Sequence, residues 1–203
     1  QRDSLIMLIS SRTADVSRIG ALNALAKYYW NCNTDSAIYY ADSARRLAAF
    51  SGNIEGEAES NRIIGVAKLY QSKDLDDIKP YLIRSLALFK ASGNSKGIAD
   101  NYNNLGSMWK YVSKYKESLL YYDSSLSIYK KLGDKKGEAA VLNYIGIIYQ
   151  EMGEFSKAID YTLQGLIVRK ATDDHLGVVY SFLNVGNIFL AGGQTERAIK
   201  YYL

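Results

Sequence analysis

Proline, cysteine and histidine are almost absent from this chain, because each occurs once in 203 residues. The single cysteine, Cys32, excludes an internal disulfide, and the single histidine, His175, excludes a histidine-rich metal site. No apolar stretch reaches the roughly 18 residues that a membrane-spanning helix needs. We therefore expect this segment to need no metal or cofactor and to make no membrane contact.

Strong charge of one sign is also missing. The net charge is +4, and Lys, Arg, Asp and Glu are mixed along the chain without a basic run, a pattern that gives little support to nucleic-acid binding. The sequence contains no G-x-S-x-G, no phosphate-binding glycine loop and no H-E-x-x-H. His175 is expected on the solvated surface. These absences predict a protein that is not an enzyme. The alternative is an enzyme whose catalytic site is built on a binding groove.

Glycine, by contrast, recurs at a fixed interval of 40 residues. Three sets of positions keep this interval: Gly97, Gly137 and Gly177; Gly106, Gly146 and Gly186; Gly153 and Gly193. Self-similarity at a fixed period of this size is typical of a repeat array.

One repeat, residues 133–172, shows two apolar stripes at helical spacing. The first runs from Val141 to Met152 and the second from Phe155 to Ile167. Gly153 lies between them, where a helix can end on a residue with positive φ. One such helix pair cannot bury its apolar faces alone, so the repeats are expected to stack on one another.

These residues resemble the tetratricopeptide repeat, whose signature places Leu-Gly before an aromatic residue in the first helix and Ala in the second. The matching positions are Leu105-Gly106 with Trp109, Ile145-Gly146 with Tyr149 and Val185-Gly186 with Phe189, followed by Ser118, Ala158 and Ala198. The family period is about 34, and Lys130 and Lys170 stand where the family closes with Pro. The second helix is therefore expected to run on by about three residues.

The resemblance implies an all-α fold, an α-α superhelix of about five helix-turn-helix repeats in a single array over residues 1–203. We expect repeats at about 14–53, 54–93, 94–133, 134–173 and 174–203, with residues 1–13 as an N-terminal cap or arm. The chain begins at Gln1 and ends inside a helix pattern. We therefore expect a segment of a longer protein, with a truncated last repeat followed by further repeats or a capping helix.

Two places depart from the regular pattern. One extra residue falls between Ser72 and Ile78, close to the only proline, Pro80. Proline is tolerated only in a first helical turn, so the second helix of repeat two is expected to start near Asp76 or Asp77 or to bend at Pro80. Cys32, near the first turn, is expected to be a small, half-buried filler, with a reactive thiol as the alternative.

In the family, the first helix of each repeat lines a concave face. The resemblance therefore implies that polar side chains at fixed places around the repeat glycine form a peptide-binding groove. The candidate residues are Asn23, Lys27, Arg62, Asn103, Ser107, Lys110, Asn143, Gln150, Asn184 and Asn187.

Asparagine recurs among these positions, and its side chain carries both a donor and an acceptor. Such a ladder can bond the backbone of an extended peptide; the alternative is that these side chains bond to neighbouring repeats or to water. Lys27, Arg62 and Lys110 favour an acidic ligand. The apolar groove residues either anchor ligand side chains or pack under a cap; they are Trp30, Leu69, Tyr144 and Leu190.

The expected function is a non-catalytic scaffold that binds a protein, a peptide or another part of its own parent chain. The long, Tyr- and Asn-rich repeat resembles the sensor segments that precede membrane helices in bacterial signalling proteins such as histidine kinases, which implies the periplasmic side of a membrane. The alternative is an intracellular, cytoplasmic regulator that responds to a peptide, or an assembly adaptor. Both hypotheses leave open a homodimer.

Overall fold

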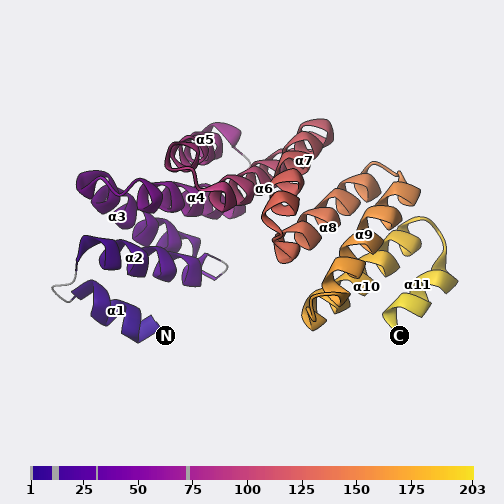
Figure 1. Cartoon of the computed structure of the whole chain (residues 1–203). Helices are drawn as coiled ribbons and strands as arrows, with labels where there is room; N and C mark the ends of the chain where they lie inside the picture. The colour runs from indigo at the N-terminus through magenta and orange to yellow at the C-terminus, as the bar shows by residue number, and fades with distance from the viewer. Residues whose placement is uncertain (1, 11–13, 31, 72–73) are drawn as a thin grey trace. The chain divides into compact units, whose positions relative to one another are not determined.

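The computed structural model describes residues 2–10, 14–30, 32–71 and 74–203, and these residues form eleven α-helices and no strand (Figure 1). After the first helix, the others follow as five helix-turn-helix repeats, which confirms the predicted all-α repeat fold. The helices are α1 (Arg2–Ser10), α2 (Asp15–Tyr29), α3 (Thr34–Ser51), α4 (Ile54–Gln71), α5 (Leu75–Ser92), α6 (Ser95–Tyr111), α7 (Tyr115–Leu132), α8 (Lys135–Glu151), α9 (Phe155–Lys170), α10 (His175–Ala191) and α11 (Thr195–Tyr202).

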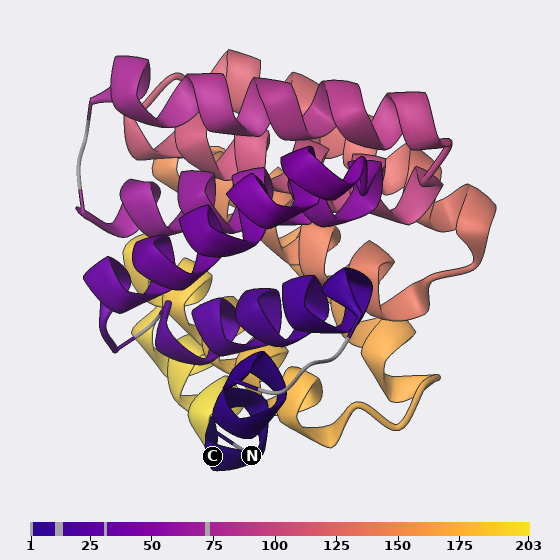
Figure 2. The same ribbon diagram turned by 90° about the vertical axis from the view of Figure 1, so that its left-hand side faces the viewer.

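The helices belong to two compact units, Gln1–Val112 and Ser113–Leu203, here unit 1 and unit 2. In unit 1 each helix from α1 to α6 packs against the next, and α2 also contacts α4, which contacts α6 (Figures 1 and 2). In unit 2 the helices from α7 to α11 pack in the same sequential way, and α8 contacts α10. Within each unit, the first helices of successive repeats are therefore direct neighbours.

The repeated glycines at the start of the first helices serve packing. The side chain of Asn94 caps α6 by accepting a 2.8 Å hydrogen bond from the backbone N of Gly97, and Asp134 caps α8 through Gly137 N at 2.9 Å. A Cβ at Gly97 would come within 2.7 Å of Phe89 Cγ on the preceding helix. An aromatic ring covers the backbone at Gly97 and Gly137, whereas Arg169 of the preceding helix takes that place at Gly177.

Positive-φ residues end the helices at two places in the repeat. Gly52, Gly93 and Gly133 follow the second helices, and Gly153 and Gly193 follow the first, with φ between 67° and 76°. The expectation that Gly153 ends a helix in this way is confirmed. Ser113 (φ 57°) and Asp173 (φ 52°) occupy two equivalent positions without being glycine, which costs conformational free energy at those two turns.

Two local expectations need correction. Asp74, and not Asp76 or Asp77, caps α5: its side chain accepts a hydrogen bond from Asp76 N at 2.9 Å. Pro80 consequently lies in the second turn of the helix, where the aspartate cap and buried residues such as Ile78 hold the helix around it. Ser72 and Lys73, on which part of the predicted insertion falls, lie outside the described residues.

The expectation of a half-buried Cys32 is wrong. Cys32 is exposed, because it stands in the connection after α2 ends.

The N-terminal helix packs on the first repeat. Ile9 of α1 contacts the cluster formed by Ile19, Leu22, Ala44 and Ala48. Most of α1 is otherwise exposed, including Ile6 and Met7. None of the described helices combines the length and the apolar character that crossing a membrane requires.

Candidate functional site

A partly buried ion cluster lies on the first-helix face of unit 1. Glu59 of α4 accepts hydrogen bonds from Arg62 Nε at 2.8 Å and Arg62 Nη2 at 2.6 Å, and it also pairs with Lys27 of α2. Burial alone would raise the pKa of Glu59, but the hydrogen bonds and positive charges of Arg62 and Lys27 outweigh it and lower the pKa to about 2. Two predicted site residues, Lys27 and Arg62, thus meet at one carboxylate.

A pocket of about 280 Å³ opens beside this cluster. It is lined by Lys27, Glu55, Glu59, Phe89, Asn94, Lys96, Gly97 and Asp100. Asn94 Nδ2 donates a 3.2 Å hydrogen bond to Glu55 Oε1. Charges of both signs and an aromatic edge surround one cavity, which suits a zwitterionic or amide-rich segment such as a peptide backbone with charged side chains.

Asn23 is used inside the protein. It is 6% exposed, its Oδ1 accepts a 2.9 Å hydrogen bond from Ser60 Oγ, and its Nδ2 donates to the carbonyl oxygen of Gly56 at 3.4 Å. Both partners lie on α4, the first helix of the next repeat. Asn23 therefore joins neighbouring repeats, which is the alternative role considered for these asparagines.

Asn103, Ser107 and Lys110 lie on α6. The side-chain oxygen of Asn103 is buried and has no hydrogen-bond partner in the described structure, and the same holds for Asn104 Nδ2. Ser107 Oγ donates a 3.1 Å hydrogen bond to the carbonyl oxygen of Asn103, and Lys110 is half-buried. A buried amide without a partner is a natural place for a ligand or water hydrogen bond.

In unit 2, the predicted asparagines bond to each other. Asn184 Nδ2 on α10 donates a 2.9 Å hydrogen bond to Asn143 Oδ1 on α8. Asn187 is exposed and accepts a 2.7 Å hydrogen bond from the hydroxyl of Tyr202. Gln150 is half-buried on α8. The structure thus brings together Asn143 and Asn184, while Asn187 faces the end of the last helix.

The apolar candidates differ in exposure. Trp30 packs on the buried cluster of Ala26, Ala41, Ile63 and Ile64, and Leu69 is half-buried. Tyr144 stacks on Tyr122 with ring centroids 5.7 Å apart, and Leu190 is 51% exposed.

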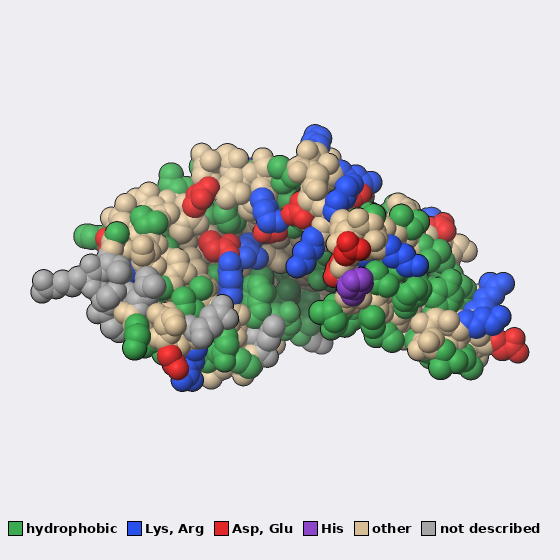
Figure 3. Space-filling model, turned by 60° about the horizontal axis from the view of Figure 1, so that its bottom comes forward, with side chains coloured by type: hydrophobic (Ala, Val, Ile, Leu, Met, Phe, Trp, Pro, Cys, Tyr) green, Lys and Arg blue, Asp and Glu red, His purple; other side chains and the backbone are tan. Residues whose placement is uncertain are grey.

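Hydrophobic side chains also gather beside His175, the purple residue of Figure 3, which is exposed as expected. The exposed hydrophobic residues of α10 are Leu176, Val179, Tyr180, Leu183 and Leu190. The exposed surface of α10 is therefore rich in apolar side chains.

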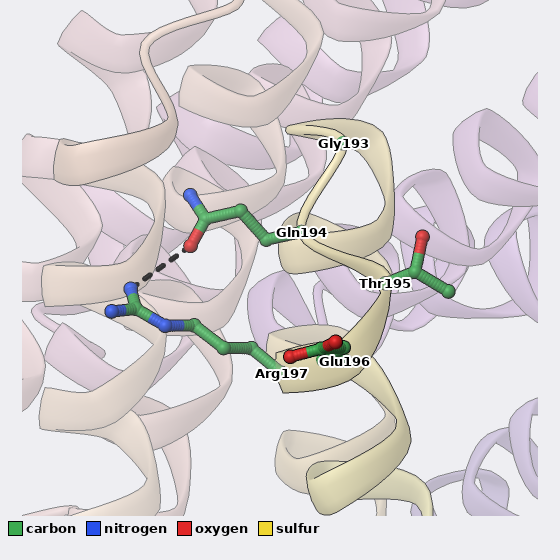
Figure 4. A pocket seen from close by; sticks show the side chains of 5 residues that line it. All are labelled: Gly193, Gln194, Thr195, Glu196 and Arg197. Atoms are coloured by element: carbon green, nitrogen blue, oxygen red, sulfur yellow. Dashed lines mark hydrogen bonds between the residues drawn. The ribbon is translucent and has the colours of Figure 1, made fainter.

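A further pocket of about 460 Å³ lies at the turn before α11 and is lined by residues 193–197 (Figure 4). Arg197 Nη1 donates a 2.9 Å hydrogen bond to Gln194 Oε1, while Thr195 points the other way. These side chains diverge, so they do not form a set that converges on one ligand. Among the described residues, no cluster of His, Cys, Asp and Glu is arranged to hold a metal ion.

Sequence reasoning missed the acidic side of the unit 1 pocket. Glu59, Glu55 and Asp100 are not among the candidate residues named from the sequence, yet Glu59 is the centre of the ion cluster. Its position three residues before Arg62 was the available signal, because residues at that spacing share one face of a helix.

Helix pairs that recur every 40 residues, with the first helices adjoining within each unit, define a helical repeat protein. The family model described as tetratricopeptide repeat matches residues 97–166 and 137–203. These matches together cover more than half of the chain, so the chain belongs to the tetratricopeptide repeat family.

Solved structures share this fold at low sequence identity. A Rap protein complexed with competence and sporulation factor has a TM-score of 0.84 at 16% identity, over 95% of this chain and 54% of its own. NprR in complex with its cognate peptide NprX has a TM-score of 0.73 at 16% identity, over 98% of this chain and 58% of its own.

A putative kinesin light chain from Podosopora anserina, with nearly identical TPR-like repeats, has a TM-score of 0.71 at 15% identity, over 94% of this chain and 93% of its own. The chain thus spans about half the length of the Rap protein and of NprR. Curated protein sequences give no significant match.

Proposed function

We propose that this chain is a non-catalytic binding module that holds a peptide or a segment of a partner protein on its first helices. The observation that carries the proposal is the pocket beside the Lys27–Glu59–Arg62 cluster. Lys27 and Glu59 line a cavity that also contains Lys96 and Asp100. Because it carries charges of both signs, such a cavity can pair with acidic and with basic side chains of a peptide.

The similar structures support this class of ligand, since the Rap protein was solved with competence and sporulation factor and NprR with its cognate peptide. The proposed contact residues in unit 1 are Asn23, Lys27, Arg62, Asn103, Ser107 and Lys110, and those in unit 2 are Asn143, Gln150, Asn184 and Asn187. Asn23 would act mainly through its contact with α4, whereas Asn103 offers an unpaired oxygen directly.

We further propose that the module is the sensory or interaction region of a larger bacterial signal-transduction protein on the periplasmic side of a membrane. The alternative is an intracellular peptide-responsive regulator or assembly adaptor. The flanking sequence of the gene separates the two: an apolar span of about 20 residues followed by kinase motifs supports the sensor.

The binding proposal is tested with an array of random dodecapeptides probed with the labelled protein. Bound peptides are then measured by fluorescence anisotropy against Lys27→Met, Asn103→Ala and Gln150→Ala, with Arg84→Met as a control on an exposed part of α5. We expect the first three variants to weaken binding about 10-fold and the control to leave it unchanged. Unchanged affinity in all three folded variants would remove the first helices from the site.

A further inference from the structure

A second pocket, of about 520 Å³, lies in unit 1 on the side formed by the second helices. Its lining comes from α3, α4 and α5, and consists of Ile38, Tyr39, Asp42, Ser43, Arg46, Ile64, Lys68 and Tyr81. None of these residues belongs to the first-helix site described above. The pocket therefore lies at the junction between repeats one and two, where α3 and α5, the second helices of the two repeats, meet α4, the first helix of repeat two.

The last junction of the array is closed at the same positions. Lys68 and Phe189 each follow the repeat glycine by three residues, and Asp42 and Leu163 each follow the buried alanine of the second helix by five. Five of the eight lining residues have these equivalents: Ile38 and Ile159, Asp42 and Leu163, Ile64 and Val185, Lys68 and Phe189, and Tyr81 and Tyr201. In the last junction, the second members form a single hydrophobic cluster around Ala198.

Among these five pairs, two polar replacements distinguish the first junction: Asp42 for Leu163 and Lys68 for Phe189. Phe189 stacks on Tyr201 with ring centroids 5.4 Å apart, and at the junction of repeats three and four Tyr149 stacks on Tyr161 at the same centroid distance. At the first junction, Lys68 takes the place of that aromatic ring. Its Nζ lies 5.6 Å from the centroid of the Tyr81 ring.

The charged groups that line the pocket at the first junction already have ion-pair partners. Lys68 Nζ bonds both carboxylate oxygens of Asp77, at 2.7 and 2.8 Å. Asp42 accepts a 2.9 Å hydrogen bond from Arg45 Nε and a 2.8 Å bond from Arg46 Nε. Leucine at position 42 and an aromatic residue at position 68 would close this junction, as Leu163 and Phe189 do in unit 2. Selection for stability alone would therefore not favour the open pocket.

The chemistry of the lining selects a ligand class. The floor is apolar at Ile64, which is 1% exposed, and the tyrosine rings of Tyr39 and Tyr81 offer flat apolar surface. Arg46 and Lys68 line the pocket with Asp42, and their partners Arg45 and Asp77 lie beside it. These three cations and two carboxylates together leave one net positive charge. An apolar side chain next to a carboxylate complements this combination, since a cation and a carboxylate form strong charge-assisted hydrogen bonds.

We propose that this pocket binds the C-terminal residue of a peptide or protein whose last side chain is apolar. A free C-terminus is the place in a polypeptide where an apolar side chain and a carboxylate belong to one residue. The side chain lies on Ile64 between the tyrosine rings, and the carboxylate faces Lys68 and Arg46. This site is independent of the first-helix site, so the two can be occupied together.

The test uses the isotope-labelled chain and three probes in NMR titrations: N-acetyl-Ala-Phe with a free carboxylate, the same dipeptide as its amide, and N-acetyl-Asp-Phe-amide. We expect the free carboxylate to shift amide signals of residues 38–46 and 64–68 with a Kd of about 1 mM. The amide should bind about 10-fold more weakly because it lacks the charge. The third probe tests an internal acidic segment as the source of the carboxylate.

Two variants and a control complete the test. Lys68→Met should weaken the free carboxylate about 10-fold, and the double variant Asp42→Leu with Lys68→Phe should abolish binding by filling the pocket. Arg84→Met removes a cation from α5 outside the pocket and should change nothing. Four outcomes would each overturn the assignment. The acid and the amide bind equally, the third probe binds most tightly, the shifts are confined to other surfaces, or no saturable shift occurs up to about 10 mM. Lys68→Met alone decides the matter if the double variant does not fold.

Discussion

Asn184 Nδ2 donates a 2.9 Å hydrogen bond to Asn143 Oδ1, and this bond joins α8 to α10. The two asparagines are not at the same place in the repeat: Asn143 precedes Gly146 by three residues, whereas Asn184 precedes Gly186 by two. The polar contact between repeats is therefore a staggered pair, which the 40-residue period by itself does not reveal.

Asn184→Ala should lower the free energy of unfolding by about 1–2 kcal/mol, because Asn143 is 8% exposed and would lose its partner. Urea denaturation followed by circular dichroism measures the change. Asn187→Ala is the matched control, since Asn187 is exposed and its hydrogen bond to Tyr202 is at the surface. Equal losses in the two variants would contradict a structural role for the staggered pair.

Gly137→Ala should destabilise the protein by about 1–3 kcal/mol, because a Cβ there would come within 2.7 Å of Tyr129 Cζ. Thermal unfolding measures this change. Gly20→Ala serves as the control: no atom lies within 4 Å of its Cβ position, so the alanine should stabilise α2 by about 0.5–1 kcal/mol. Adding Tyr129→Leu to Gly137→Ala should restore part of the loss; no recovery would mean that the ring is not the obstacle.

Asp173→Gly should raise the free energy of unfolding by about 1 kcal/mol, because Asp173 adopts φ 52° where the equivalent Gly133 adopts 67°. Differential scanning calorimetry measures the rise in Tm. The converse change, Gly133→Asp, should lower stability by a similar amount. A neutral or negative effect of Asp173→Gly would show that the aspartate side chain compensates for its backbone conformation.

Stability should fall as the pH drops from about 4.5 towards about 2, because the pKa of Glu59 is lowered from 4.5 to about 2 in the folded protein. The folded state then binds fewer protons than the unfolded state, so its advantage is present above the unfolded pKa and is lost on acidification. Glu59→Gln should remove about 3 kcal/mol at neutral pH and flatten this part of the profile. Tm measured from pH 7 to pH 2.5 checks both; parallel profiles would contradict the ion cluster.

Asp42→Leu together with Lys68→Phe should raise the free energy of unfolding by about 1–2 kcal/mol, because an apolar junction replaces charged groups held around an open pocket. Chemical denaturation measures the gain. The reverse exchange in unit 2, Leu163→Asp together with Phe189→Lys, should be strongly destabilising, since Phe189 is 8% exposed in its cluster. A loss of stability in the first double variant would show that the charges hold the junction together.

The helix pairs were predictable because each depends on local patterns: apolar spacing, Asn or Asp caps and glycine at positive φ. Gly153 and the Asp174 cap follow from residues within a few positions along the chain. Pro80 was harder, because the Asp74 cap moved the start of α5 towards the N-terminus and left the proline in the second turn.

The side-chain partners at the candidate site were not predictable in the same way. The pairing of Asn23 with Ser60, and of Lys27 with Glu59, joins residues more than 30 positions apart and depends on how α2 and α4 align. The pocket at Lys68 did leave a trace in the sequence, since a lysine stands where Trp109, Tyr149 and Phe189 follow the other repeat glycines. Comparing repeats with one another would have found it.

The exchange of an aromatic ring for Lys68 has a consequence for how such chains diversify. Each junction between neighbouring repeats is lined by a few side chains of its own. A single repeat can therefore acquire a pocket through two substitutions. Binding specificity can then be added at one junction while the packing of the other junctions is unchanged.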